Sequence, residues 1–418
     1  MPARSRLLPL YGLLCASCAW AQSAAPEPES VGDRFVRNNA APGIMAGPWK
    51  ISPSATSAGG YDDNIAFGAD GDAVSSPVAE LRGRLDVTNE DGPDGVALHA
   101  EIGQTWHSDA AAFDHLDWSA GASFGVQVSD YVRIRGTLGA MADETPDATT
   151  DGIVIGGSFD PYVDLARYTR VPASLAVAFD SGRWQALLAG EIAWSDYDDR
   201  LTRGGAAVDQ SFRNGTNSDI RLRAGWRAVP GTALFVEGGA NIQRYDDASA
   251  DSDGWRAVAG AEFAFSRLLT GEVFAGYAAQ SFSGGGEVTG LTYGASLTWF
   301  PTDLISLRLT ARRDFGAERT AQDAGGTITA PVTRDSVRLA AEYEPLRQML
   351  VRAELGWGQD VYDGQDRRDE RFFTGLGFDY VFTPRVRAVF DWRHEQRSSE
   401  VAGDATRNLF RLGLTAGY

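Results

Sequence analysis

The chain has 418 residues, 48 of them glycine, and a formal net charge of −18 at pH 7. That charge argues against a nucleic-acid partner, because nucleic acids are bound through clustered positive charge. The glycine content is too high for a helical protein and suits crowded strands and turns.

The first 21 residues have the features of a secretory signal peptide. Arg4 and Arg6 form a short basic start, a mostly apolar stretch follows, and Ala19-Trp20-Ala21 fits the small-x-small cleavage pattern. The stretch is too short to cross a membrane as a helix. Cleavage after Ala21 removes both cysteines of the chain, so no disulfide is expected in the mature protein. Residues 22–48 then form an N-terminal periplasmic segment.

The rest of the chain, 49–418, is predicted to form one all-β domain of about eighteen strands, with about sixteen as the alternative. Apolar and polar residues alternate along it with the two-residue period of a strand, and no apolar run approaches the roughly 20 residues of a membrane-spanning helix. The strands are expected at 50–63, 78–90, 95–107, 115–128, 131–142, 170–180, 183–195, 218–229, 232–244, 254–266, 268–281, 287–300, 303–315, 333–344, 347–359, 371–382, 385–397 and 407–418. Short turns alternate with longer links at 143–169, 196–217, 316–332 and 360–370. This is the pattern of a transmembrane up-and-down antiparallel β-barrel with short periplasmic turns.

The tryptophans give a second indication of a membrane barrel, because two belts of aromatic rings are expected where such a barrel meets the lipid headgroups. One group lies near the short-turn ends of the strands: Trp49, Trp184, Trp226 and Trp299. The other lies near the long-loop ends: Trp106, Trp118, Trp194, Trp255 and Trp357. Trp392 falls in the middle of a strand and does not fit either belt.

Alternation also places charged residues of both signs on one face of the strands. Between 218 and 229, Leu222 shares a face with Trp226, and Arg223 lies on the other face. A charge facing lipid costs roughly 2–4 kcal/mol near the midplane, so the charged face is predicted to line a lumen. The predicted lumen residues are Arg82, Arg84, Arg133, Arg135, Arg221, Arg223, Glu237, Arg308, Arg312, Arg338, Glu342, Arg352, Glu354, Arg387 and Arg393.

Two interpretations of this charged face remain open. A barrel of 16–18 strands is wide enough to hold water, so rows of arginine would form a conduit that attracts anionic solutes. Alternatively, arginine and glutamate only pair across neighbouring strands.

Motifs for catalysis and metal binding are few. Gly121-Ala122-Ser123-Phe124-Gly125 matches G-x-S-x-G but sits inside an alternating strand, whereas a nucleophile elbow needs a strand, a sharp turn and a helix. His107-Ser108-Asp109 is the only candidate for a membrane hydrolase, but adjacent residues of a strand point to opposite faces. The four histidines are not spaced in the chain as pairs of zinc ligands are. Acidic residues cluster in the predicted loops, but their spacing is not that of a calcium-binding loop. We therefore predict no enzyme activity, no cofactor and no bound metal.

The last predicted strand resembles the C-terminal signal of bacterial outer-membrane proteins. It ends in an alternating pattern of polar, glycine, apolar and aromatic residues, carried by Arg411, Gly413, Ala416 and Tyr418. This resemblance implies a location in the cell outer membrane, contact with lipid and lipopolysaccharide, and insertion by the barrel-assembly machinery.

The start of the barrel resembles a particular family. Residues 41–54 run into Gly60-Tyr61-Asp62-Asp63-Asn64, and a first strand that ends in Tyr-Asp-Asp-Asn is similar to the putative β-barrel porin 2 family. Trp194-Ser195-Asp196-Tyr197-Asp198 resembles other strand ends of that family. The resemblance implies an outer-membrane barrel, often associated with exopolysaccharide loci, and hence polysaccharide-export components as partners.

The function classes that remain are a channel for hydrophilic or anionic solutes and a structural or adhesive barrel with a closed lumen. A membrane hydrolase is a third, more distant function class.

Overall fold

The computed structural model describes residues 29–89, 95–145, 152–155, 158–161, 164–202, 205, 207–265, 268–284, 286–322, 327–363, 366–401 and 403–418. The predicted signal peptide, residues 1–21, lies outside the described residues. None of the helices in the described ranges is long and apolar enough to cross a membrane.

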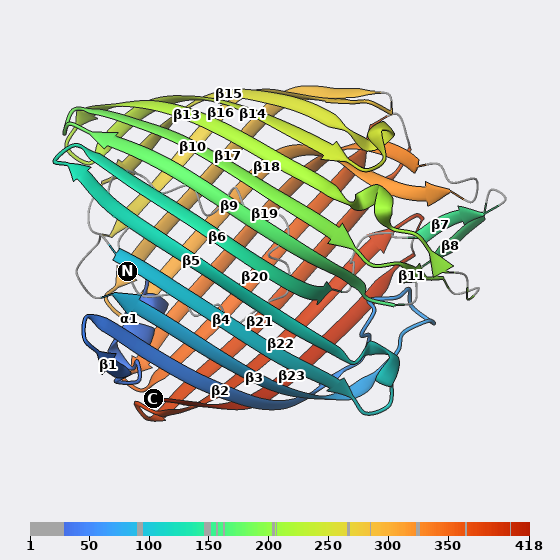
Figure 1. Ribbon diagram of the computed structural model, residues 1–418, viewed down its shortest axis with the longest axis horizontal. Coiled ribbons are helices and arrows are strands. Elements are labelled where there is room, and N and C mark those ends of the chain that lie inside the picture. The colour runs from blue at the N-terminus through green and yellow to red at the C-terminus, as the bar shows by residue number, and fades with distance from the viewer. Residues whose placement is uncertain are drawn as a thin grey trace.

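Eighteen long antiparallel strands form a closed barrel, which confirms the predicted fold and strand number (Figure 1). Each strand pairs with its neighbour in the chain, and the first pairs with the last, so the sheet has no free edge along most of its length. The strands are β2 (Trp49–Asp62), β3 (Ser76–Asn89), β4 (Gly95–His107), β5 (His115–Ser129), β6 (Val132–Thr145), β9 (Ala166–Asp180), β10 (Trp184–Tyr197), β13 (Gly215–Val229), β14 (Thr232–Tyr245), β15 (Ser252–Ala264), β16 (Leu269–Phe282), β17 (Glu287–Thr302), β18 (Ile305–Gln322), β19 (Thr327–Leu346), β20 (Met349–Tyr362), β21 (Arg368–Thr383), β22 (Val386–Ser399) and β23 (Ala405–Gly417).

The prediction of a long loop at 316–332 is wrong. The β18–β19 ladder continues to the pair Ala321 and Thr327, so most of this segment is strand. The residues from Gly316 to Gln322 show no regular apolar alternation. An ion pair on the outer face, between Arg313 and Asp335, already marks the start of this polar extension. Backbone pairing needs no apolar side chains, so the ladder persists in water.

The link between β6 and β9 also contains strands. It forms the hairpin of β7 (Gly152–Ile155) and β8 (Ser158–Pro161), and β7 pairs in parallel with the extended end of β18. The remaining short elements at this end are β11 (Arg200–Leu201), β12 (Ala207–Val208) and the 3-10 helices η2 (Ala111–Phe113), η3 (Ser211–Arg213) and η4 (Ala248–Ala250). Figure 1 shows the hairpin beyond the mouth of the barrel where the long loops gather.

The outer face of the barrel is apolar, with aromatic rings at both ends. Leu222 and Leu412, near the middle of their strands, are 58% and 62% exposed. Exposed rings at the short-turn end are Tyr131, Trp184, Trp299, Tyr343 and Tyr418, and those at the long-loop end are Trp106, Trp118, Trp194, Trp255, Tyr293 and Trp357. The two predicted belts are thus present, although Trp49 and Trp226 are only half-exposed. Trp392 lies between the belts and stacks on Phe410 of the neighbouring strand.

Some inward-facing phenylalanines lie flat against the wall over a glycine of the next strand. A Cβ atom at Gly294 or Gly356 would overlap the ring of Phe274 or Phe373. Glycine at these positions lets the ring cover the neighbouring backbone, an arrangement that protects glycine-rich strands. The rings therefore line the wall instead of projecting across the interior.

The chain before the barrel contributes to both its edge and its interior. β23 pairs with β2 only between Ser54 and Asp62, and the strand β1 (Ile44–Ala46) folds back to pair with Trp49–Ile51. An edge that would otherwise expose its backbone is covered in this way. Ahead of β1, the helix α1 (Val31–Asn38) lies at the short-turn end (Figure 1).

Candidate functional site

The inward-facing side chains of the barrel strands form a charged surface, which we call the inner wall. On β3, Leu81 and Leu85 are exposed on the outer face, and Arg82 and Arg84 alternate with them on the inner one. The same alternation holds on β13, where Leu222 faces outward and Arg223 inward. Ion pairs join the inward residues of neighbouring strands, so the inner wall is a set of charge clusters.

The first cluster lies on β3, β4 and β23. The Arg82 guanidinium donates to Glu80 at 2.7 Å and to Glu101 at 2.5 Å. Arg84 donates to Asp86 at 2.7 Å. Arg411, which belongs to the predicted assembly signal, lies 3.5 Å from Glu80 and so is part of this cluster.

The second cluster, on β13 to β16, surrounds Arg223. Its guanidinium contacts three carboxylates, Glu237 at 2.8 Å, Glu262 at 2.8 Å and Glu272 at 2.6 Å. It also lies over the ring of Phe235, 3.9 Å from the ring centre. Arg256 pairs with Glu237 from the other side. The positive charge of Arg223 is therefore fully compensated within the wall.

Sequence reasoning missed two of these carboxylates. Glu262 and Glu272 were not among the predicted lumen residues, although Glu262 shares its face of β15 with Arg256. They are 12% exposed in their side chains, so they belong to the wall as much as Arg223 does. Extending the alternation through every strand would have found both.

Most of the other predicted lumen arginines also have partners. Arg352 contacts Asp379 at 3.0 Å and Asp391 at 3.1 Å. The further contacts are Arg338 with Glu354 at 2.7 Å, Arg393 with Glu395 at 2.7 Å, Arg387 with Asp379 at 4.0 Å, Arg133 with Gln127 at 2.8 Å, and Arg312 with Asp314. Arg135 and Arg221 make interactions as well. Arg308 is the exception, since it makes neither a hydrogen bond nor an ion pair with any residue that the structure describes.

The helix α1 forms because its sequence suits a short amphipathic helix. The Ser30 side chain accepts a hydrogen bond from the Asp33 backbone at 3.0 Å and caps the first turn. Val31 and Phe35, four residues apart, lie on one face and are fully buried against Leu350 and Val381 of the inner wall. The helix is thus attached to the inside of the barrel.

Polar contacts fix the position of α1 on the wall. The Val31 amide donates to Ser306 Oγ at 3.2 Å, and the Gly32 amide donates to the Glu342 carboxylate at 2.8 Å. Arg34 pairs with Glu344 at 2.8 Å. Glu342, predicted as a lumen residue, therefore binds the first turn of the helix, where a negative charge is stabilised by the unpaired amides.

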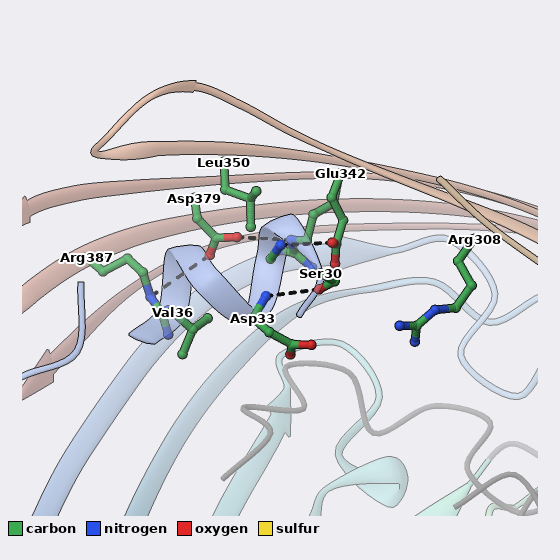
Figure 2. Close-up of a pocket in the computed structure, with 10 residues that line it drawn as sticks. Ser30, Asp33, Val36, Arg308, Glu342, Leu350, Asp379 and Arg387 are labelled. Atoms are coloured by element: carbon green, nitrogen blue, oxygen red, sulfur yellow. Dashed lines mark hydrogen bonds and ion pairs between the residues drawn. The ribbon is translucent and has the colours of Figure 1, made fainter. Parts of the chain in front are cut away.

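A cavity of about 210 Å³ lies between α1 and the inner wall (Figure 2). Its charged lining comes from Asp33 on the helix and from Arg308, Glu342, Asp379 and Arg387 on the wall, with Arg352. Several of these groups are paired with one another, and dashed lines in Figure 2 mark the contacts. Arg308 lines the cavity near the start of the helix and stands apart from the paired groups.

The Tyr61-Asp62-Asp63-Asn64 segment lies where β2 meets β23 at the long-loop end. Arg407 donates to Asp62 at 3.0 and 3.1 Å, and both side chains are buried. The Asp63 carboxylate accepts from the Asn408 side chain at 2.8 Å. Asn64 donates to the Thr406 carbonyl at 3.0 Å. We call Asp62, Asp63, Asn64, Arg407 and Asn408 the seam latch, because together they join the first and last strands of the barrel.

The sequence model of the putative beta-barrel porin 2 family matches residues 39–418, which is nearly the whole described chain. The chain belongs to this family. The match confirms the resemblance found at the start of the barrel, and the motif behind it is the one that builds the seam latch.

Several solved structures are similar to this chain. They include OpdL of Pseudomonas aeruginosa, at 14% identity and a TM-score of 0.45, covering 88% of this chain and 99% of that one. OpdO of the same organism has 16% identity and a TM-score of 0.46, with 88% and 97% covered. OccAB4 of Acinetobacter baumannii has 10% identity and a TM-score of 0.44, with 88% and 98% covered. Identities this low carry no information about a shared solute, and no curated protein matches the chain in sequence.

The catalytic candidates do not come together in this porin 2 barrel. Ser123 lies within β5, and the strand continues past Gly125 without a turn. The His107 ring lies 3.7 Å from Asp114, while the Asp109 amide bonds to Ser76. In the described ranges, no group of three or more histidine, cysteine or acidic side chains could hold a metal ion. The absence of enzyme activity and of a cofactor stays a prediction.

Proposed function

We propose that this barrel is a channel for small hydrophilic solutes with a modest preference for anions. The observation that carries the proposal is a charged inner wall inside a closed barrel of eighteen strands. Barrels of this strand number enclose water unless their interior is filled. The preference is modest because most arginines of the wall are compensated by carboxylates. A structural or adhesive barrel with a closed lumen is the competing function.

Single-channel recording tests this proposal. The purified, folded protein is added to a planar lipid bilayer in KCl, and the same protein after heat denaturation is the control. We expect discrete current steps from the folded protein only. A folded barrel that inserts into lipid without current steps would favour the closed, structural alternative.

We also propose that the barrel resides in the cell outer membrane, surrounded by lipid and lipopolysaccharide after insertion by the barrel-assembly machinery. Family membership and the apolar outer face between two aromatic belts support this. Membrane fractionation of cells that express the full chain is the test. Recovery in the soluble periplasmic fraction would contradict it.

We further propose that the solute is an exported acidic polysaccharide, as the resemblance to the family implies. Arg308, which has no partner among the described residues, supports an acidic solute, since it would attract uronate carboxylates. Liposome swelling compares entry of acidic and neutral oligosaccharides of equal length. Equal rates for the two would argue against this solute class.

A further inference from the structure

Arg308 differs from the other predicted lumen arginines because its charge is not compensated. It is half-buried, it lines the cavity beside α1, and it has no partner among the described residues. Arg223, in contrast, contacts three carboxylates. An uncompensated guanidinium next to a water-accessible cavity is a binding group for anions.

The helix α1 engages a carboxylate that is a diagonal neighbour of Arg308 in the sheet. In the β18–β19 ladder Glu342 lies opposite Ser306, so Arg308 is its diagonal neighbour on the same face. Long side chains reach each other across such a diagonal. Glu342 is instead held by the Gly32 amide and by Ser306 Oγ, at 2.8 and 2.7 Å. Docking of the helix thus engages Oε2 of this carboxylate, and Arg308 makes no ion pair with it in the described structure.

One negative charge opposes Arg308 across the cavity. Asp33 lies on the exposed side of α1, and its carboxylate has no partner in the described part of the chain. Water screens an exposed charge more strongly than a half-buried one, so Arg308 has the larger effect on an ion in the cavity. The other charged groups that line it are engaged in pairs with one another or with the helix.

We infer that the cavity between α1 and the inner wall is the selectivity site of the channel, with Arg308 as its anion-binding group. The inference rests on the proposed channel function. Its ligands are small anions, from chloride to simple carboxylates. The negative charge of Asp33 limits the preference for anions. Removing the charge of Arg308 should therefore lower anion selectivity, and removing that of Asp33 should raise it.

Reversal potentials in a KCl gradient test the inference, with chloride as the probe. Arg308→Gln should lower the ratio of chloride to potassium permeability by roughly sevenfold, because a unit charge about 7 Å away in water changes the energies of the two ions by about RT each, in opposite directions. Asp33→Asn should raise the ratio, and Arg308→Lys should keep it near that of the native protein.

The matched control is Arg313→Gln. Arg313 lies on the same strand as Arg308 but on the outer face, paired with Asp335, so its removal changes the net charge equally without touching the lumen. An equal shift for Arg308→Gln and Arg313→Gln would overturn the inference while the channel proposal stands. A native protein without current steps would overturn both. Heat-modifiable mobility on gels verifies that each variant is folded.

Discussion

The seam latch allows a quantitative prediction about the stability of the barrel. Asp62 and Arg407 are 3% and 6% exposed in their side chains. Removing one partner of a buried ion pair costs about 3–5 kcal/mol, because the other charge stays buried without compensation. After Asp62→Asn, Arg407 still has Glu395 at 3.7 Å, so we expect a loss near the lower end, about 3 kcal/mol. Arg407→Gln leaves the buried Asp62 carboxylate without an ion-pair partner in the described structure, whereas Glu395 keeps Arg393, and it should cost closer to 5 kcal/mol.

A double-mutant cycle separates the pair from its surroundings. The free energy of unfolding is measured in lipid vesicles from tryptophan fluorescence as a function of urea concentration. Asp62→Asn combined with Arg407→Gln should cost less than the sum of the two single changes by about 2 kcal/mol or more. The matched control is the outward pair of Arg313 and Asp335, where Arg313→Gln should cost less than about 1 kcal/mol. Additive losses, or equal losses at the latch and at this control, would refute the reasoning.

Three further predictions follow from the packing of the wall and the helix. Phe35→Asp places a charge in the fully buried contact of α1, so the helix should leave the wall. Single-channel conductance should then rise and the preference for anions should fall, and unchanged currents would contradict this. Gly356→Leu displaces the Phe373 ring and should cost about 1–3 kcal/mol in urea unfolding, whereas Gly238→Ala, which meets no atom within 4 Å, should have little effect. Leu222→Arg on the lipid face should cost about 2–4 kcal/mol, and Val229→Arg near the short-turn end less than about 1 kcal/mol; equal costs would show that the depth assignment is wrong.

The barrel was predictable from the sequence because the membrane enforces alternation on every strand. The predicted strand at 95–107 coincides with β4, and the other predicted strands overlap observed ones. The prediction failed at 316–332, where the β18–β19 ladder continues although the residues from Gly316 to Gln322 show no regular apolar pattern. Alternation of apolar and polar residues arises where one face of a strand must be apolar. A strand with water on both faces need not show it.

The candidate site was predictable only in part. Which residues face inward follows from periodicity, as for Arg223 and Arg308 alike. Whether each arginine has an ion-pair partner depends on residues elsewhere in the fold: Glu272 lies three strands from Arg223, and α1 binds Glu342 from 310 residues away. A short helix gives no indication in sequence of the surface on which it docks.

The seam latch has a consequence for the order of assembly. Asp62 and Arg407 are separated by 345 positions in the chain. Bringing such distant segments together costs about 4 kcal/mol more chain entropy than closing a hairpin of about four residues. The hairpins between successive strands should therefore form first, and the joining of β2 to β23 should be the slow, final step. Until then both edges can pair with a foreign strand, so the time spent before closure sets the risk of aggregation.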